Sequence, residues 1–318
     1  MKKKGIGYAC MIYGTGYGNG FPDESRATIE LLEDGLIMVS VEATDVGQGA
    51  KNVMKQIAAE TLEIPIDLIA VQNSDSTKME DSGTAAASRQ TYNTGNAVMD
   101  GCKNFKRQFI DPYIKEDKIK KEKNYSTILR WLYKRLNEVG MEVKTAGYFK
   151  AKTSSVNLET GQGNPYWPYT FSVNRAVVEV DDETGKVDAL EITACHDSGK
   201  IINPIMAQGQ IEGGCAMGLG YALMEKVEFK EGCIKNPNFA DYIIPTSIDV
   251  PKIKTYFIEE DEVTGPYGAK GLGEPSMIST APAILNAIYD AVGVRILDLP
   301  ATCDKVLLAI KNKEKNNG

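Results

Sequence analysis

The most informative segment of the chain places one carboxylate in a restricted loop. Glu274 stands between Gly273 and Pro275, in a segment that runs from Gly268 to Pro275 just before an expected helix. Glycines let a backbone approach a bulky ligand, and a following proline restricts the conformation of the residue before it. Such a carboxylate is held in place and can serve as a general base. From spacing alone, a tight turn with an exposed glutamate is a slightly better interpretation.

A second candidate is the small-residue segment 82–89, of sequence Ser-Gly-Thr-Ala-Ala-Ala-Ser-Arg. Small side chains expose backbone N–H groups, hydroxyls add donors, and an arginine can bind a pyrophosphate through two hydrogen bonds. The candidate phosphate-binding residues are Gly83, Thr84, Ala85, Ser88 and Arg89. The alternative is a helix start packed closely against a neighbour, and the residues support both interpretations equally.

Two glycine–glutamine elements can each bring an amide to a polar cofactor at the start of a helix. One is Gly47-Gln48-Gly49 and the other contains Gln210 after a glycine. Either element alone is a weak signal. Another glycine-rich loop spans 14–20 but lacks the dinucleotide fingerprint after a strand, so a Rossmann site is not supported. Tyr13 and Tyr17 in this region can face a flat substrate, although an exposed loop tyrosine is commoner.

The composition argues against several classes of protein. A formal net charge of −7 disfavours nucleic acid as the main partner, and the lysine run at 115–123 is interrupted by acidic residues, as on a solvated face. No apolar stretch approaches the ~20 residues of a membrane span, and the N-terminus lacks the apolar run of a signal peptide. We therefore expect a cytoplasmic protein. The six cysteines form no C-x-x-C pair, so any iron–sulfur centre would belong to another chain.

His196 is the only histidine, and no G-x-S-x-G elbow is present, so a serine triad is not expected. The residue follows an expected strand. We interpret it as a structural turn residue that satisfies its neighbours rather than as a catalytic group.

The elements that must position these residues can be read from periodicity and turn signals. Alternation around Asp34-Gly35 predicts a hairpin over 26–43, and helical spacing predicts a helix that ends near 62. The further expectations are a strand over 66–73, a hairpin over 171–194, a helix over 203–224, a helix that ends at Gly293, and a short last helix. We expect a first half-domain over 1–105, a charged helical connector over 106–145, and a second half-domain over 146–318.

Taken together, these segments resemble the second molybdopterin-binding domain of the xanthine oxidase and aldehyde oxidoreductase family of molybdenum hydroxylases. Residues 46–49 resemble its first cofactor loop, and residues 83–90 resemble its dinucleotide-phosphate loop. Residues 197–220 resemble its D-x-G-x-x-x-N-P stretch with G-Q-x-x-G-G, and residues 270–275 resemble the element that bears its catalytic glutamate. The resemblance covers about 5–310 and implies an α+β fold of two mixed half-domains with hairpins and helices.

The resemblance implies a molybdenum that is held by a molybdopterin and not directly by protein side chains. The Ser88-Arg89 form is similar to members that use the cytosine dinucleotide version. The implied reaction is hydroxylation of an N-heterocycle, such as a purine or nicotinate, or of an aldehyde, with water as the oxygen source. Glu274 would be the catalytic base. The other implied cofactor contacts are Gln210 near the metal, Gln48 on the pterin side, and Lys270, Gly271 and Gly273 in the loop before the glutamate.

The family's catalytic chain carries a preceding molybdopterin domain that has no counterpart here. Because Met1-Lys2-Lys3-Lys4 resembles a natural start, we expect a split enzyme, similar to some nicotinate dehydrogenases, rather than a fragment. The active site would form with a larger molybdopterin-binding subunit, and electrons would pass to iron–sulfur ([2Fe-2S]) and FAD subunits. Neither nucleic acid nor a membrane is an expected partner. The competing classes are a non-catalytic scaffold subunit without metal and an ordinary nicotinamide-dependent dehydrogenase.

Overall fold

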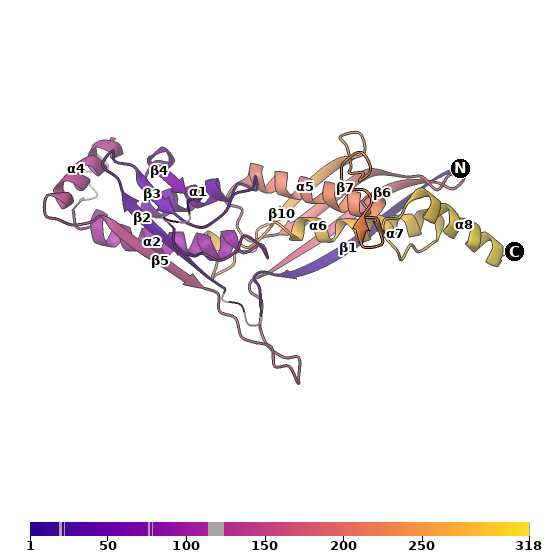
Figure 1. Cartoon of the computed structure of the whole chain (residues 1–318), viewed down its shortest axis with the longest axis horizontal. Helices are drawn as coiled ribbons and strands as arrows, with labels where there is room; N and C mark the ends of the chain where they lie inside the picture. Colours follow the sequence, from indigo (N-terminus) through magenta and orange to yellow (C-terminus); the bar gives the residue numbers. More distant parts are fainter. Residues whose placement is uncertain (19–20, 22, 76, 78, 114–123, 318) are drawn as a thin grey trace.

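The computed structural model describes residues 1–318 except 19–20, 22, 76, 78, 114–123 and 318. The molecule is an elongated α+β structure of two units that lie end to end, with both termini at the same end (Figure 1). Each unit contains a four-stranded sheet with helices packed against it. The lysine run at 115–123 and Gly20 of the glycine-rich loop lie outside the described residues.

The first unit has a sheet of strand order β4-β3-β2-β5. Strand β2 is antiparallel to β3 and β5, and β3 is parallel to β4, which confirms the predicted hairpin, helix and strand. The elements are β2 (Glu24–Leu31), β3 (Ile37–Ser40), α1 (Ala50–Leu62), β4 (Ile69–Gln72), α2 (Gly95–Phe105), α4 (Tyr125–Asn137) and β5 (Lys144–Lys150), with a 3-10 turn (Ile66–Leu68) and two π-helical turns (Gln90–Thr94 and Lys106–Ile110).

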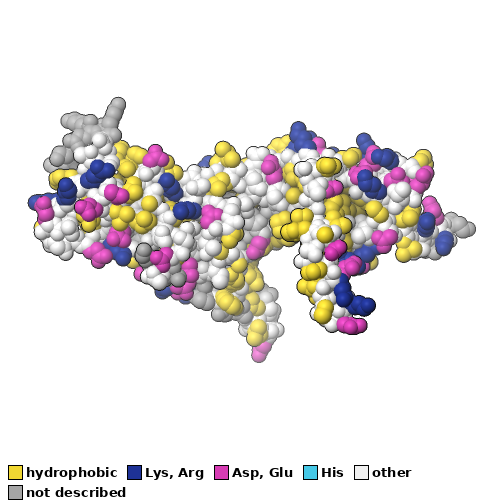
Figure 2. Space-filling view, turned by 45° about the horizontal axis from the view of Figure 1, so that its top comes forward, with side chains coloured by type: hydrophobic (Ala, Val, Ile, Leu, Met, Phe, Trp, Pro, Cys, Tyr) yellow, Lys and Arg dark blue, Asp and Glu magenta, His cyan; other side chains and the backbone are white. Residues whose placement is uncertain are grey.

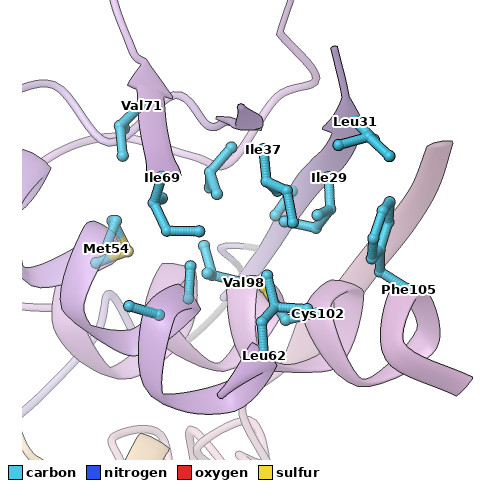
Figure 3. Close-up of a cluster of buried hydrophobic side chains, with 14 of the residues drawn as sticks. Ile29, Leu31, Ile37, Met54, Leu62, Ile69, Val71, Val98, Cys102 and Phe105 are labelled. Atoms are coloured by element: carbon cyan, nitrogen blue, oxygen red, sulfur yellow. The ribbon is translucent and has the colours of Figure 1, made fainter. Parts of the chain in front are cut away.

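The core of the first unit lies between this sheet and its helices. Figure 3 shows Ile29 of β2 and Ile69 of β4 above Leu62 of α1 and Val98 of α2. Each such side chain contributes about 1.5–3 kcal/mol when fully buried. The apolar side of α4 joins the same core through Leu129, Leu132 and Leu136. The predicted connector at 106–145 therefore needs correction, because its helix is an integral part of the first unit.

The second unit has a sheet of strand order β1-β6-β7-β10, in which β1, β6 and β7 are antiparallel and β10 is parallel to β7. The predicted second hairpin and the three helices that follow it are confirmed. The elements are β1 (Lys2–Gly14), β6 (Tyr169–Asp181), β7 (Val187–Asp197), α5 (Pro204–Leu223), β8 (Phe229–Lys230), β9 (Cys233–Ile234), β10 (Lys252–Ile258), a 3-10 turn (Pro266–Gly268), α6 (Pro275–Ile278), α7 (Thr280–Val292) and α8 (Cys303–Asn317).

Strand β1 lies in the second unit, so the predicted first half-domain of 1–105 is wrong for its first residues. The strand pairs with β6 along its whole length, and α7 packs on it. A Cβ atom on Gly5 would lie 2.1 Å from the carbonyl oxygen of Ala287, and one on Gly7 would lie 2.2 Å from that of Ala283. The two glycines therefore let α7 approach the strand. This pairing spans more than half of the chain, which local sequence patterns do not encode.

The sheet of the second unit has one face covered by helices and one face without a described partner, which we call the open face. In the middle of β1, Gly5, Gly7 and Met11 are buried on one face, whereas Ile6, Tyr8 and Ile12 are exposed on the other. Apolar side chains of the open face are Ile6, Tyr8, Ile12, Phe171, Val173, Tyr256 and Ile258. Figure 2 also shows apolar side chains along two projecting arms, which correspond to 152–168 and 225–249. No helix in the described part of the chain is long and apolar enough to cross a membrane.

Candidate active site

A cavity of about 340 Å³ is lined by residues of both units near the N-terminal ends of α1 and α5. These helices lie where the two units meet in Figure 1. Asn203 before α5 donates from Nδ2 to Oε1 of Gln56 in α1 across 3.0 Å, which joins the two helices. The cavity is lined by Val46, Gln48, Ala50, Val53, Ala85, Ala86 and 88–91 from the first unit, and by 198, 200–203, 206, 207, 210, 269, 270 and 272–274 from the second.

Glu274 lies at this cavity with both carboxylate oxygens engaged. Its Oε1 accepts a hydrogen bond from the backbone N–H of Ala87 across 3.0 Å, and its Oε2 accepts one from the hydroxyl of Tyr13. The backbone N–H of Glu274 donates to Oγ of Ser88 across 3.0 Å, and Pro275 begins α6 directly after it. The carboxylate is therefore oriented by two different segments of the chain. Glu274 is also an exposed turn residue, so the tight-turn interpretation describes its position as well.

The segment that fixes Glu274 has a strained backbone. Ala87 and Ser88 have φ values of 55° and 53°, in the left-handed region that favours glycine. Two successive residues of this kind cost about 1–3 kcal/mol each, and such strain persists where the surroundings determine it. Gly16 supports the turn by donating its N–H to the carbonyl of Ala87 across 3.1 Å. The strained turn points an N–H at the carboxylate.

Tyr13 and Tyr17, predicted to face a substrate, have different surroundings. Burial and the hydrogen bond to Glu274 both raise the pKa of Tyr13, so its phenol stays protonated and donates. The hydroxyl of Tyr17 hydrogen-bonds to Oγ1 of Thr84, and its ring stacks near Phe21 with centroids 5.3 Å apart. Neither tyrosine lines the cavity, and only Tyr13 reaches Glu274.

Arg89 does not offer its guanidinium to a ligand, which corrects the predicted pyrophosphate contact. The side chain is 1% exposed, and its Nε lies 2.8 Å from Oδ1 of Asp23. The two terminal nitrogens donate to the carbonyls of Ser82 and Glu24 across 2.8 and 2.6 Å. Gly83 has a positive φ and packs so closely on this guanidinium that a Cβ would lie 2.5 Å from it. The buried side chain of Arg89 therefore stabilises the conformation of the 82–89 loop through these hydrogen bonds.

Lys270 and Gly271 also hold the loops together rather than face the cavity with free groups. The Nζ of Lys270 lies 2.8 Å from Oδ2 of Asp197, in a pair whose side chains are 7% and 13% exposed. A Cβ on Gly271 would lie 2.3 Å from the carbonyl oxygen of Ser88. The predicted role of Gly271 as a direct cofactor contact is corrected to loop packing. Gly273 and Lys270 line the cavity, but the ammonium group of Lys270 is already paired.

The Gly47-Gln48-Gly49 loop is largely satisfied by its own chain. Gln48 donates from Nε2 to the carbonyl of Thr44 and to Gln90, and it accepts from Val46. Asp45 accepts the backbone N–H groups of Gly47, Gly49 and Lys51. Burial acts to raise the pKa of Asp45, but these hydrogen bonds outweigh it and the pKa is lowered. The start of α1 is thus already neutralised by a carboxylate. Gln48 lines the cavity, and both polar atoms of its side chain already have hydrogen-bond partners in the chain.

Free polar groups do face the cavity at other positions. The side chain of Gln210 on α5 hydrogen-bonds to no described residue, and neither do the backbone N–H groups of Ala85 and Ala86. Ser198 is 3% exposed, and its Oγ has no described partner. A Cβ on Gly209, beside Gln210, would meet nothing within 4 Å, so α5 leaves room on that side. Ser198 is buried, Gln210 is half-buried, and Ala85 and Ala86 are exposed, so a polar group seated in the cavity would give these unpaired groups a partner.

Two features were not anticipated from the sequence. Ser198 directly follows β7, within the stretch 197–220. The sequence did not identify it as a site residue, although its place directly after a strand was a signal that could have done so. His196 was interpreted as a turn residue with satisfied neighbours, and this is wrong. It lies in β7, is 1% exposed, and neither ring nitrogen has a described hydrogen-bond partner. Burial lowers its pKa to about 4.

Fold and cavity together define an α+β cofactor-binding module with a fixed carboxylate at the edge of its cavity. No group of three or more His, Cys, Asp or Glu that could hold a metal ion occurs among the residues described. The free backbone amides of Ala85 and Ala86, the amide of Gln210 and the hydroxyl of Ser198 fit a bound organic group with several polar atoms.

Comparisons with known proteins identify the class. A family model described as molybdopterin cofactor-binding domain matches residues 1–251. The chain is 33% identical over 315 residues to the putative xanthine dehydrogenase molybdenum-binding subunit of Escherichia coli strain K12, covering 94% of this chain and 41% of that protein. It is 33% identical over 314 residues to an aldehyde oxidoreductase of Megalodesulfovibrio gigas, covering 97% of this chain and 32% of that protein.

The solved structures agree with this similarity. The aldehyde oxidoreductase from Desulfovibrio gigas matches with a TM-score of 0.85 at 32% identity, over 98% of this chain and 33% of that chain. The chain belongs to the molybdopterin cofactor-binding domain family of the xanthine dehydrogenase and aldehyde oxidoreductase type, which confirms the resemblance and the fold class. It spans 41% and 32% of the length of the two relatives named above.

Proposed function

We propose that this chain is the molybdopterin-binding part of a molybdenum hydroxylase that oxidises an N-heterocycle or an aldehyde, with Glu274 as the catalytic base. The observation that carries the proposal is the carboxylate of Glu274, which is fixed at both oxygens on the edge of the cavity. The names of the relatives, xanthine dehydrogenase and aldehyde oxidoreductase, support the two substrate classes.

Specific groups of this chain would hold the cofactor. The free backbone N–H groups of Ala85 and Ala86 would bind its phosphates, because unpaired amides in a loop form an anion site. Gln210 and the hydroxyl of Ser198 would bind polar atoms nearer the metal. We infer the cytosine dinucleotide form from the Ser88-Arg89 sequence, although Arg89 itself only supports the loop. When bound, the cofactor supplies the redox-active molybdenum that accepts the two electrons of the oxidation.

Glu274 would take the proton from the oxygen nucleophile that attacks the substrate carbon. The phenol of Tyr13 and the amide of Ala87 both donate to its carboxylate, so each oxygen is oriented before substrate arrives. A base positioned in this way contributes about 10²–10⁴-fold to the rate. The strained turn at Ala87 and Ser88 is the structural cost of this orientation.

A second polypeptide region would complete the site. The E. coli relative is longer than the match, since this chain covers only 41% of that protein. The open face of the sheet offers a broad apolar surface to a larger molybdopterin-binding chain, with Ile12 71% and Tyr8 58% exposed. [2Fe-2S] and FAD subunits would then receive the electrons. Ile12→Asp should remove the partner from the purified complex, whereas Leu297→Asp, at a position 91% exposed outside this face, should not.

The test is to purify the native complex through this chain and to quantify molybdenum, acid-released cytidine monophosphate and the chains that co-purify. Near-stoichiometric metal and nucleotide with a second molybdopterin-binding chain would support the proposal. A lone chain without either would support the alternative, a scaffold subunit that keeps the fold without metal, and the role of Glu274 would be abandoned.

A further inference from the structure

Every unpartnered buried side-chain atom found in the described residues lies in one region of the second unit. These atoms are Oγ1 of Thr15, Oγ1 of Thr170, Oδ1 of Asn174, both ring nitrogens of His196, and Oγ of Ser198. They come from β6 and β7, or from the residue directly after β1 or β7. Because all six unpartnered atoms lie in or next to one sheet, we look for one explanation for all of them.

The strand register brings these residues together on the covered face of the sheet. Tyr13 is the register partner of Thr170, and Ser172 is the partner of His196. Continuing the register by one residue beyond β7 places Ser198 opposite Thr170. Directly opposite residues have Cβ atoms about 4.5–5.5 Å apart, so the polar atoms form a contiguous cluster.

The cluster lies beneath the loop that carries Glu274. A Cβ built on Gly271 would lie 3.1 Å from Oγ1 of Thr15, so this orphan hydroxyl faces the underside of the loop. Leu272 of the same loop packs against the small apolar cluster of Ile192, Ala194, Ile211 and Cys215 next to His196. Ser198 also lines the cavity. The polar cluster therefore extends from the cavity to the interior behind the catalytic loop.

Water is the ligand that fits these groups. A neutral imidazole has one donor and one acceptor nitrogen, and hydroxyls can do both, so a molecule that donates and accepts is required. His196 is 1% exposed, which keeps any partner chain out of reach. The described residues offer no carboxylate or thiol set with His196 that could hold a metal ion. Buried waters typically make about three hydrogen bonds to polar groups that otherwise lack partners.

We propose that the covered face beneath Gly271–Ser276 is a binding site for a cluster of internal water molecules, held by Thr15, Thr170, His196 and Ser198. The cluster opens into the cavity at Ser198 and supports the Glu274 loop from below. His196 is its central positioning residue. The water site goes beyond the proposed catalytic function, because its groups are present whether or not the cavity binds molybdopterin.

The sign of a stability change tests the proposal. Thr170→Val keeps the side-chain shape and removes the orphan hydroxyl. If water bridges Thr170 to its neighbours, the variant loses a hydrogen bond and the Tm of the full chain, with any chain that co-purifies, falls by about 2 °C. If the site is dry, removal of an unpaired buried hydroxyl leaves the Tm unchanged or raises it, which overturns the proposal. Thr145→Val is the matched control, because Thr145 is buried and its Oγ1 donates to Gly101 across 3.0 Å.

A crystal structure of the unmutated protein gives a second, independent answer that does not depend on a variant folding. At a resolution that shows ordered water, density within hydrogen-bonding distance of the His196 ring nitrogens and of Oγ1 of Thr170 is expected. A dry cluster, or ring nitrogens bound to a protein group, would overturn the water site. Molybdenum content measured on the same sample reports separately on the proposed function.

Discussion

The backbone N–H of Ala87 donates to Oε1 of Glu274 across 3.0 Å, although 187 positions separate the two residues in the chain. The donor belongs to the first unit and the acceptor to the second, so this hydrogen bond joins the two units at the edge of the cavity. The orientation of the carboxylate therefore depends on how the two units pack. Glu274 can act as a base only in the folded arrangement that brings this N–H to it.

Glu274→Gln should lower kcat by about 10²–10⁴-fold, because the amide cannot take up a proton but has nearly the same shape. The side-chain oxygen can still accept from Ala87, so the loop and the cofactor content should be unchanged. Steady-state kinetics together with molybdenum and nucleotide analysis check both parts. The matched control is Glu60→Gln on α1, an exposed glutamate outside the cavity, which should keep full activity. Full activity of the Glu274 variant would exclude the residue as the base.

Tyr13→Phe should lower kcat by about tenfold and leave KM largely unchanged. The variant removes one hydrogen bond to a carboxylate, and bonds to charged groups contribute about 1.5–3 kcal/mol. Because the phenol is protonated up to high pH, the effect should persist across the neutral pH range. Tyr8→Phe, on the open face of the same strand, is the control. A rise in KM without loss of kcat would indicate instead that Tyr13 binds substrate.

Arg89→Met should lower the free energy of unfolding by about 3–5 kcal/mol, because it leaves Asp23 buried without its cation. The additional change Asp23→Asn should restore part of this loss, since it removes the unpaired charge. Urea unfolding of the single and double variants measures the coupling. A stable Arg89→Met variant that fails to retain nucleotide would show instead that Arg89 contacts the phosphate directly.

The helices and hairpins could be predicted because their signals are local. Alternation around Asp34-Gly35 and the apolar spacing that ends near Leu62 encode the hairpin of β2 and β3 and the helix α1 without reference to distant residues. Gly293 has φ 67° and ends α7, as expected for a glycine at a helix C-terminus. Glu274 was identified in the same way, from the glycine and proline beside it.

The long-range contacts could not be predicted in this way. Nothing near Arg89 indicates that Asp23, 66 positions earlier, forms an ion pair with it, and so the sequence left a ligand contact and close packing equally supported. Residues 2–14 carry no local sign that they pair with 169–181 in the other unit. The neighbours of His196 are likewise set by strand register and not by the residues beside it in the sequence.

His196 makes stability depend on pH in a defined direction. Burial lowers its pKa to about 4 in the folded chain, whereas the unfolded chain takes up this proton near the ordinary value of 6.5. Between these values the unfolded state binds more protons, so stability is full above pH 6.5 and is lost as the pH falls towards about 4, by up to about 3 kcal/mol. Because the chain has one histidine, His196→Gln should abolish this part of the pH dependence while the carboxylate contributions remain. Urea unfolding of both proteins from pH 4 to pH 7.5, about one unit beyond the upper pKa, measures the difference. A constant difference over this range would mean that burial does not lower the pKa of this imidazole in the folded protein.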